Sequence, residues 1–200
     1  MGQVARLCSR NQGKLRELRA ALPGWEIELL DADDYPPETG ETYYANARGK
    51  ADFGRERERD VWVIGEDSGL EVAGLGGRPG IHSARFGGDD PVGPLLAELD
   101  GVEDRRARYV CELVALAPDG VERRGTGTLE GRIVDEPRGS EGFGYDPIFV
   151  PDGEERTVAE LGNEWKRTHS HRARAAAALA AAAREDRHPA ARNVTPSKDT

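Results

Sequence analysis

The chain has 200 residues, of which 37% are hydrophobic and 32% charged, and its formal net charge is -9. This length suits one globular unit, or two lobes that share a sheet, and allows a substantial buried core. The acidic balance excludes broad electrostatic binding of DNA or RNA, because such binding needs clustered Lys and Arg. Any phosphate site must therefore be local.

No stretch approaches the roughly 20 consecutive apolar residues of a membrane span, and the first residues lack the apolar core of a signal peptide. Gly2 does not open a myristoylation motif, because Arg6 stands where Ser or Thr is required. We therefore expect no membrane partner and a cytoplasmic location. Cys8 and Cys111 lie in apolar, strand-like runs and are expected to be reduced core residues.

The first half of the chain predicts strands alternating with helices. Strands are expected at residues 4–8, 26–30 and 61–65, and helices at residues 14–22 and 42–57. The strand at 61–65 is expected to end just before the carboxylates of Glu66 and Asp67. Residues 74–88, which are rich in Gly and Pro, predict a functional or lobe-connecting loop without regular structure.

The second half predicts a hairpin followed by a long helix. After a short helix at residues 91–99, two β-like runs at 107–117 and 122–129 flank the turn Pro118-Asp119-Gly120, which is typical of an antiparallel hairpin. The Ala-rich segment 165–184 predicts a helix. The fold class is therefore α/β with a mixed sheet. Residues 1–184 are expected to form one domain, and residues 185–200 a disordered polar tail.

The turn at residues 9–14 is the first candidate phosphate site. Asn11 can cap the following helix, whose free N–H groups attract an anion, and Lys14 adds a positive charge. The segment is not a P-loop, because Leu15 replaces the required Ser or Thr and Cys8 replaces the first Gly. Taken alone, it also fits an ordinary capped surface helix.

The pair Glu66 and Asp67 is the candidate catalytic centre. Carboxylates next to an apolar run must find a cation, a donor or a proton, and Mg²⁺ is the natural cation, with Glu38 as a second ligand. An acidic turn capped by Asp67 and Ser68 is the alternative. Ser68 itself does not fit the G-x-S-x-G pattern of a nucleophile.

Other segments supply groups suited to a nucleotide. Asn46 and Lys50 share one face of the second helix and could hold a phosphate and a ribose hydroxyl, although such pairs are usually solvated. Phe143 can stack on a base, or pack in the core. Lys166 and Arg172 supply hydrogen-bond donors suited to a purine 6-oxo group. The histidines lack the spacing of a zinc site.

Seven motifs occur in order along the chain: Ser9-x-Asn11-x-x-Lys14-x-x-Glu17, Glu38-Thr39-Gly40, Asn46-Ala47-x-x-Lys50-Ala51, Asp67-Ser68-Gly69-Leu70, Pro79-Gly80-Ile81-x-Ser83-Ala84-Arg85, Gly142-Phe143-Gly144-Tyr145-Asp146-Pro147 and Ser170-His171-Arg172. With these motifs the chain resembles the inosine/xanthosine triphosphate pyrophosphatase family. The resemblance runs from residue 4 to about residue 183.

The resemblance implies a two-lobed mixed α/β fold with an elongated sheet and a central active-site cleft, a homodimer, and Mg²⁺-dependent hydrolysis of XTP, ITP or dITP to the monophosphate and pyrophosphate. This activity would remove non-standard purines from the nucleotide pool. Asp67 would be the general base, and Glu38 and Asp67 would hold the metal. The implied substrate-binding residues are Ser9, Arg10, Asn11, Gln12, Gly13, Lys14, Ser68, Phe143, Gly144, Tyr145, Asp146, Lys166, His171 and Arg172, assisted by Asn46, Lys50 and Arg85.

Three positions depart from the family pattern: Ser9 replaces the common Thr, Glu66 replaces Asp, and His82 replaces Tyr. Glu66 keeps the charge but adds a methylene, which could alter metal preference. His82 adds a group that titrates near neutral pH. Two alternatives stay open, namely a related pyrophosphatase with a different base preference and a nucleotide sensor without catalysis.

Overall fold

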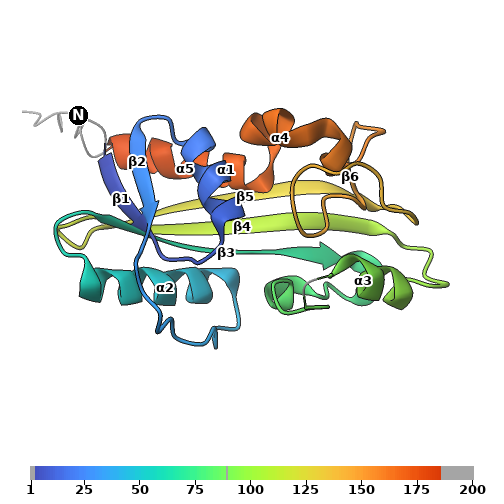
Figure 1. Ribbon diagram of the computed structural model, residues 1–200, viewed down its shortest axis with the longest axis horizontal. Helices are drawn as coiled ribbons and strands as arrows, with labels where there is room; N and C mark the ends of the chain where they lie inside the picture. The colour runs from blue at the N-terminus through green and yellow to red at the C-terminus, as the bar shows by residue number, and fades with distance from the viewer. Residues whose placement is uncertain (1–2, 89, 186–200) are drawn as a thin grey trace, which may run out of the picture.

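The computed structural model describes residues 3–88 and 90–185. Within these residues, a six-stranded mixed sheet has the order β2-β1-β3-β4-β5-β6 (Figure 1). β1 pairs in parallel with β2 and β3, and the remaining pairs are antiparallel. The strands are β1 (Gln3–Leu7), β2 (Trp25–Leu29), β3 (Trp62–Val72), β4 (Arg106–Leu116), β5 (Glu122–Ile133) and β6 (Phe149–Pro151).

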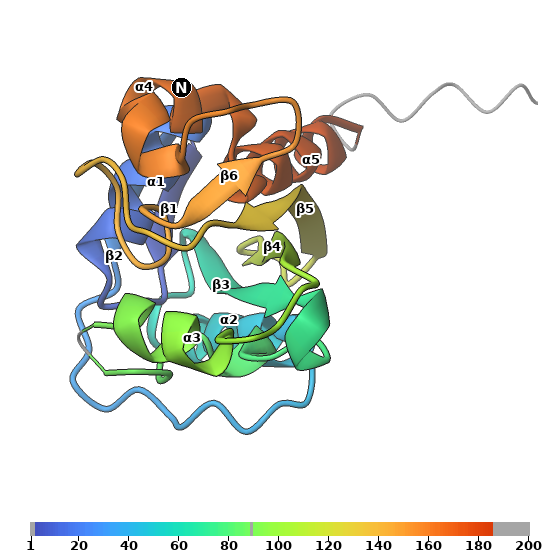
Figure 2. The same ribbon diagram turned by 90° about the vertical axis from the view of Figure 1, so that its right-hand side faces the viewer.

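Helices cover both faces of this sheet. In Figures 1 and 2, α1, α4 and α5 lie on one face, whereas α2 and α3 lie on the other. None of the helices in the described part of the chain is long and apolar enough to cross a membrane. The helices are α1 (Gln12–Ala21), α2 (Tyr43–Arg57), α3 (Val92–Glu98), α4 (Val158–His169) and α5 (His171–Glu185).

The predicted α/β class, the mixed sheet and the hairpin of β4 and β5 are confirmed. Asn11 caps α1 as predicted, because its side chain accepts a hydrogen bond from the backbone N–H of Lys14 at 3.1 Å. Of the predicted tail, residues 186–200 lie outside the described residues, and Glu185 instead ends α5. The division into a domain and a tail therefore stays a prediction.

Three predicted boundaries are wrong. β3 does not end at residue 65 but runs on to Val72, so the two carboxylates lie inside a strand. The single helix predicted at residues 165–184 is two helices, because the backbone of Ser170 is extended and separates α4 from α5. The loop predicted at residues 74–88 includes the 3-10 helix η2 (Gly80–His82) and part of η1 (Ala73–Leu75).

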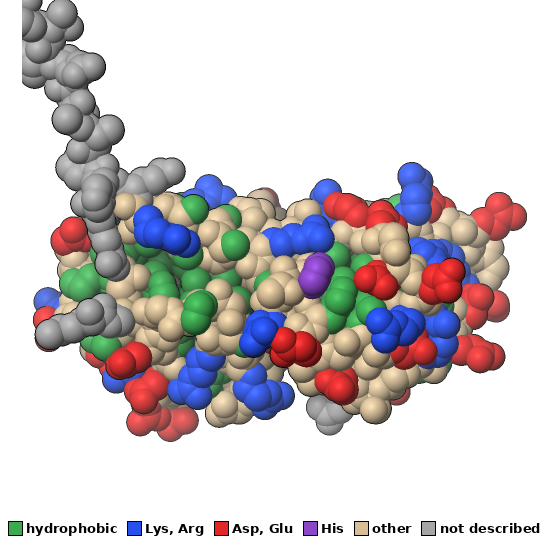
Figure 3. Space-filling model, turned by 90° about the horizontal axis from the view of Figure 1, so that it is seen from above, with side chains coloured by type: hydrophobic (Ala, Val, Ile, Leu, Met, Phe, Trp, Pro, Cys, Tyr) green, Lys and Arg blue, Asp and Glu red, His purple; other side chains and the backbone are tan. Residues whose placement is uncertain are grey.

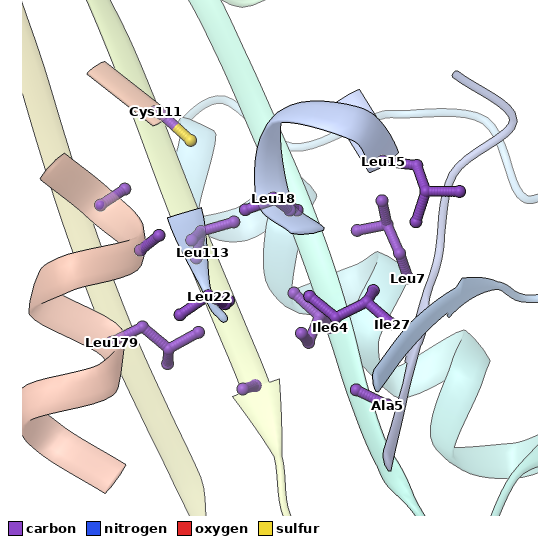
Figure 4. Packing of buried hydrophobic residues seen from close by; sticks show 13 residues of the cluster. Ala5, Leu7, Leu15, Leu18, Leu22, Ile27, Ile64, Cys111, Leu113 and Leu179 are labelled. Atoms are coloured by element: carbon purple, nitrogen blue, oxygen red, sulfur yellow. The ribbon is translucent and has the colours of Figure 1, made fainter. Parts of the chain in front are cut away.

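One hydrophobic cluster joins the sheet to α1 and α5. Figure 4 shows Leu18 and Leu179 from the two helices beside Ile64 and Leu113 from the central strands. Cys111 belongs to this cluster, and both cysteines are free and fully buried, as predicted. Burial of such side chains contributes about 1.5–3 kcal/mol each for Leu and Ile. This packing fixes α1 and α5 against β3.

A second cluster lies around the C-terminal half of β3, where Leu70 and Val72 pack with Tyr109, Tyr145 and Phe149. The middle of β3, which carries the polar residues 66–68, therefore lies between two apolar clusters. Polar side chains at this point are held by rigid elements on both sides, which suits a preorganised site.

Two glycines allow helices to approach the sheet closely. A Cβ on Gly65 of β3 would lie 1.8 Å from the carbonyl oxygen of Ala47 in α2. A Cβ on Gly127 of β5 would lie 2.1 Å from the carbonyl oxygen of His171, at the start of α5. Both glycines therefore set the positions of helices that carry candidate site residues.

Candidate active site

A pocket of about 330 Å³ opens beside the middle of β3. Its wall includes Ser68 and Leu70 of β3, Tyr109 of β4 and the first residues of α5. Further along the chain, the turn at residues 143–146 and Lys166 of α4 complete one side of it. Segments as far apart in sequence as β3 and α5 thus meet around one cavity, which is the usual arrangement of a small-molecule site.

Asp67 points from β3 toward α2. Its Oδ2 accepts a hydrogen bond from the Asn46 side chain at 3.0 Å, and its Oδ1 lies 3.3 Å from Nζ of Lys50. The same ammonium group lies 2.5 Å from Oε1 of Glu38, whose other oxygen accepts from Arg85 at 3.1 Å. Lys50 therefore brings the Glu38 and Asp67 carboxylates to one point.

Glu66 points to the opposite face, toward α1 and α5. Its buried carboxylate lies 2.5 Å from Nζ of Lys14 and 2.8 Å from Nη2 of Arg172. Arg172 also donates to Ser68 at 3.0 Å and pairs with Glu17 of α1. Because side chains alternate along a strand, neighbouring carboxylates reach different partners on the two faces.

Further ion pairs connect Arg172 to Asp146 in the wall of the pocket. Glu17 lies 2.5 Å from Nζ of Lys166, and Lys166 in turn donates to Oδ2 of Asp146 at 2.6 Å. The same oxygen accepts from the backbone N–H of Phe143 at 2.9 Å. Charges of alternating sign therefore run without a break from Lys14 through Glu66 and Arg172 to Asp146.

Phe143 forms an aromatic wall of the pocket. Its ring is only partly buried, and Nζ of Lys166 lies 4.6 Å from the ring centroid. On the α1 side, the ring packs against Gly13, where a Cβ would lie 2.9 Å from ring atoms. A partly exposed ring on a fixed turn can stack on a nucleobase.

Burial and charge set the ionisation of the site. Burial alone would raise the pKa of Glu66, but Lys14 and Arg172 outweigh it and hold that pKa well below 4.5. Burial raises the pKa of Asp67 above 3.8 despite the opposing charge of Lys50. Burial also raises the pKa of Asp146 against Lys166, and lowers the pKa of His171 well below 6.5. His171 is therefore neutral at pH 7.

The donor set around Lys50 fits Mg²⁺. Glu38 and Asp67 supply hard oxygen ligands around one cation position, which Lys50 occupies in this structure. In residues 3–88 and 90–185, no group of three or more His, Cys, Asp or Glu side chains is placed to hold an ion. Mg²⁺ commonly uses only one or two carboxylates together with substrate phosphates and water, so two ligands suffice.

Comparison with known families agrees with this geometry. The model of the Ham1 family matches residues 5–182. The chain belongs to the Ham1 family. It is 47% identical to the dITP/XTP pyrophosphatase of Symbiobacterium thermophilum, over 86% of this chain and 90% of that protein. It is 44% identical to the protein of the same name from Gloeobacter violaceus, over 84% and 88% of the two chains.

Solved structures of Ham1 proteins share the fold. The Staphylococcus aureus Ham1 protein aligns with a TM-score of 0.80 at 35% identity, covering 92% of this chain and all of that one. A structure described as a nucleoside-triphosphatase, or dITP/XTP pyrophosphatase, from Mycobacterium abscessus aligns with a TM-score of 0.68 at 41% identity, over 88% and 97%. The family resemblance and the fold predicted from the sequence motifs are both confirmed.

In this Ham1 chain, the predicted site residues form two adjoining groups. The first group lines the pocket and contains Asn11, Lys14, Ser68, Phe143, Gly144, Tyr145, Asp146, Lys166, His171 and Arg172. The second group surrounds Lys50 and contains Glu38, Asn46, Asp67 and Arg85. The two groups adjoin in the chain where Ser68 follows Asp67.

Four predicted residues of the first turn do not line this pocket, namely Ser9, Arg10, Gln12 and Gly13. The hydroxyl of Ser9 accepts from the backbone N–H of Asn11 at 3.1 Å and so shapes the turn. Arg10 donates to the carbonyl oxygen of Asp33 and lies over the ring of Tyr35. Arg10 is therefore directed to the loop before α2, and its predicted contact with substrate stays a prediction.

Glu17 and Tyr109 are among the residues of the site that were absent from the predicted set. Glu17 stands three positions after Lys14 on α1, so helical spacing already placed both on one face. It joins Lys166 to Arg172, and these two cations lower its pKa although burial alone would raise it. Tyr109 lines the pocket from β4, and no local sequence signal distinguishes it from an ordinary core tyrosine.

Proposed function

We propose that this chain is a nucleoside triphosphate pyrophosphatase that hydrolyses XTP, ITP and dITP to the monophosphate and pyrophosphate, and so removes these non-standard purines from the nucleotide pool. The observation that carries the proposal is the contact of Lys50 with both Glu38 and Asp67, beside a pocket that ends in an aromatic wall. The names of the relatives from Symbiobacterium and Gloeobacter support the same activity.

In the proposed reaction, Asp67 accepts a proton from the water that attacks the α-phosphorus. Asn46 and Lys50 contact the two oxygens of Asp67 and fix their direction, which a positioned general base requires. Lys14 and Lys50 stabilise the negative charge of the departing pyrophosphate. The reaction needs no covalent intermediate.

Glu38 and Asp67 would hold Mg²⁺. When bound, the ion would neutralise charge on the phosphate oxygens, which is the usual contribution of a metal to phosphoryl transfer. Lys50, which neutralises both carboxylates in the described structure, would then be able to turn toward phosphate oxygens. The charged, oxygen-rich set around Lys50 supports this assignment.

Base selection is assigned to the pocket beside Phe143. Lys166 and His171 are the side chains suited to contact a purine, because both line the cavity on the side of the aromatic ring. A pocket built to donate to a 6-oxo group leaves those donors unpaired with adenine, at a cost of about 1–3 kcal/mol for each lost partner. We therefore expect a strong preference for ITP over ATP.

Arg172 has a different part in this proposal from the direct base contact predicted from the sequence. Its guanidinium already contacts Glu17, Glu66 and Ser68. Holding these three side chains in place is a role that the contacts support directly. These acceptors take up four of the five N–H donors, so contact with the base would use the remaining N–H of Nη1.

The expected setting of the enzyme is cytoplasmic, with a homodimer as the assembly and no nucleic-acid partner. Free buried cysteines suit a reducing compartment. Acidic and basic side chains are interspersed on the face formed by α1, α4 and α5, and no broad basic surface appears there (Figure 3). Sedimentation analysis would test the dimer.

Product analysis tests the proposed function. Purified protein is incubated separately with ITP, XTP, GTP and ATP, with Mg²⁺ or with a chelator, and the products are separated by chromatography. Monophosphate and pyrophosphate from ITP and XTP, abolished by the chelator, are expected. Tight binding of XTP without any product would identify a sensor instead, and preferential cleavage of a pyrimidine nucleotide would identify a different base preference.

A further inference from the structure

Tyr109 has an unusual position for a residue of the hydrophobic core. It lies on β4 opposite Leu70 of β3, and only 7% of its surface is exposed. It packs with the apolar cluster at the far end of the sheet, where its ring lies 4.6 Å from that of Phe149. The same side chain also lines the pocket assigned above to the base.

Tyr109 contacts two pocket residues that come from different elements. Its ring is stacked on the imidazole of His171, with 4.6 Å between centroids and 9° between planes. Its hydroxyl donates to Oδ1 of Asp146 at 3.3 Å. One side chain thus ties the start of α5 to the turn that carries the aromatic wall.

His171 depends on this support more than Asp146 does, because Asp146 has further partners. Nδ1 of His171 is buried and has no hydrogen-bond partner among the described residues, so stacking is the contact that fixes the plane of its ring. Burial and the neighbouring Arg172 lower the pKa of His171, so a neutral ring faces the phenol. Asp146 uses its other oxygen to hold Lys166 and the backbone N–H of Phe143.

We propose that Tyr109 is a positioning residue that determines base specificity, by fixing the plane of His171 and the carboxylate of Asp146 at the base end of the pocket. The proposal rests on the pyrophosphatase activity proposed above. Tyr109 itself need not touch the reacting atoms, and it acts through the two groups that it holds. A stack of this kind and a buried hydrogen bond each contribute enough to change affinity severalfold.

Tyr109 is separated from the catalytic carboxylates by the sheet. His171 and the groups of α1 and α5 lie on one face, whereas Asn46 and Lys50 reach Asp67 from α2 on the other (Figure 1). Loss of the contacts that hold His171 and Asp146, where the nucleobase is expected to bind, should therefore raise the KM for ITP and leave kcat nearly unchanged. It should also weaken discrimination between ITP and ATP, because base contacts alone distinguish these substrates.

Two substitutions separate the two contacts. Tyr109→Phe keeps the stack on His171 and removes the hydroxyl donated to Asp146, whereas Tyr109→Leu removes both. Leu99→Ala is the control, because Leu99 is fully buried in the same cluster and lies outside the pocket wall, whereas Phe149 packs on Tyr109 itself. All three proteins are compared with the wild type for melting temperature and for steady-state hydrolysis of ITP and ATP.

We expect Tyr109→Phe to raise the KM for ITP about 3- to 10-fold, which is the loss of one hydrogen bond. Tyr109→Leu should raise it roughly 10- to 100-fold, because the stack is lost as well. In both variants the ratio of kcat/KM for ITP to that for ATP falls by at least about threefold, and kcat stays within about twofold of wild type. Leu99→Ala should lower the melting temperature without changing either KM or the ratio.

A uniform loss of kcat on both substrates, with unchanged KM and the same behaviour in Leu99→Ala, would overturn the proposal and leave Tyr109 with a structural role only. If Tyr109→Leu does not fold, Tyr109→Phe decides by itself through its KM and substrate ratio. Failure of the wild-type protein to release pyrophosphate from ITP would instead overturn the proposed function, and the inference with it. These outcomes are distinguishable because the wild type is measured first.

Discussion

Glu66 and Asp67 are neighbours in the chain, yet their carboxylates lie on opposite faces of the sheet. Glu66 contacts Lys14 and Arg172 on the α1 and α5 side, whereas Asp67 contacts residues of α2. The alternation of side chains along β3 causes this separation. The two acids therefore do not form one metal site. We assign a catalytic role to Asp67 and a mainly structural role to Glu66.

Replacing Asp67 tests its role as the base. Asp67→Asn should lower kcat for ITP by roughly 10²- to 10⁴-fold, which is the usual contribution of a positioned general base. The fold should persist, because an amide can keep contact with Asn46 and relieves the burial of a charge. Steady-state kinetics and circular dichroism measure the two effects. Near-normal turnover in a folded Asp67→Asn protein would remove Asp67 from the mechanism.

Replacing Glu66 should instead act mainly on stability. Glu66→Gln leaves Lys14 and Arg172 without the buried charge that they share, and loss of one member of a buried ion pair costs about 3–5 kcal/mol. Urea denaturation checks this, with Glu71→Gln on the same strand as the control, since Glu71 pairs with the exposed Arg108. If Glu66→Gln were no less stable than the control, the alternating ion pairs would have no structural role.

The contact of α2 with β3 at Gly65 should be needed for activity. Gly65→Ala would place a Cβ 1.8 Å from the carbonyl oxygen of Ala47, so α2 must shift and carry Asn46 and Lys50 with it. We expect a loss of stability of about 1–3 kcal/mol and a clear loss of turnover. Gly49→Ala is the matched control, because a Cβ there meets no atom within 4 Å and Ala favours a helix. Equal activity of the two variants would contradict the proposed role of α2.

Glu38 should determine the requirement for Mg²⁺. Mg²⁺ sites commonly use one or two carboxylates, and Glu38→Gln removes one of the two proposed here. The Mg²⁺ concentration for half-maximal activity should therefore rise roughly tenfold or more. Titration of activity with Mg²⁺ measures this directly. Glu41→Gln, exposed in the same loop, should leave the titration unchanged. A similar Mg²⁺ requirement in both variants would show that Glu38 is not a ligand.

His171 should make the protein less stable under mildly acidic conditions. Its pKa in the folded state lies well below 6.5, so below pH 6.5 the unfolded chain binds a proton that the folded chain does not. Stability is then lost as the pH falls, by up to about 1.4 kcal/mol per pH unit. His171→Asn should remove that slope between pH 6.5 and 5, as measured by chemical denaturation. The same change at exposed His169 should not, and an unchanged slope in His171→Asn would contradict the burial of a neutral ring.

Much of the fold follows from local sequence. The caps, the hairpin turn and the apolar runs predict most elements in the correct order. The end of β3 was misplaced because charged residues after an apolar run usually end a strand, whereas here distant cations neutralise Glu66. The start of α4 was missed although Thr157 and Glu160 form a capping box, whose sequence pattern is readable.

Local patterns and family motifs together predicted which segments carry the candidate site, but not all of its contacts. Asp67 and Lys50 were placed in one site by the resemblance, and the contact between them agrees with it. The chain of ion pairs through Glu17 was not predictable, because it joins α1 to α4 and α5 across more than a hundred residues. The place of Tyr109 likewise depends on how β4 crosses the pocket, which no short segment encodes.

In the proposed reaction, water activated at Asp67 attacks the α-phosphorus of a non-standard purine triphosphate. Hydrolysis of ITP in water enriched in ¹⁸O, followed by mass spectrometry of both products, tests it most directly. Attack at the α-phosphorus predicts inosine monophosphate that carries one ¹⁸O atom, together with unlabelled pyrophosphate. Label in the pyrophosphate, or release of the diphosphate with orthophosphate, would contradict it.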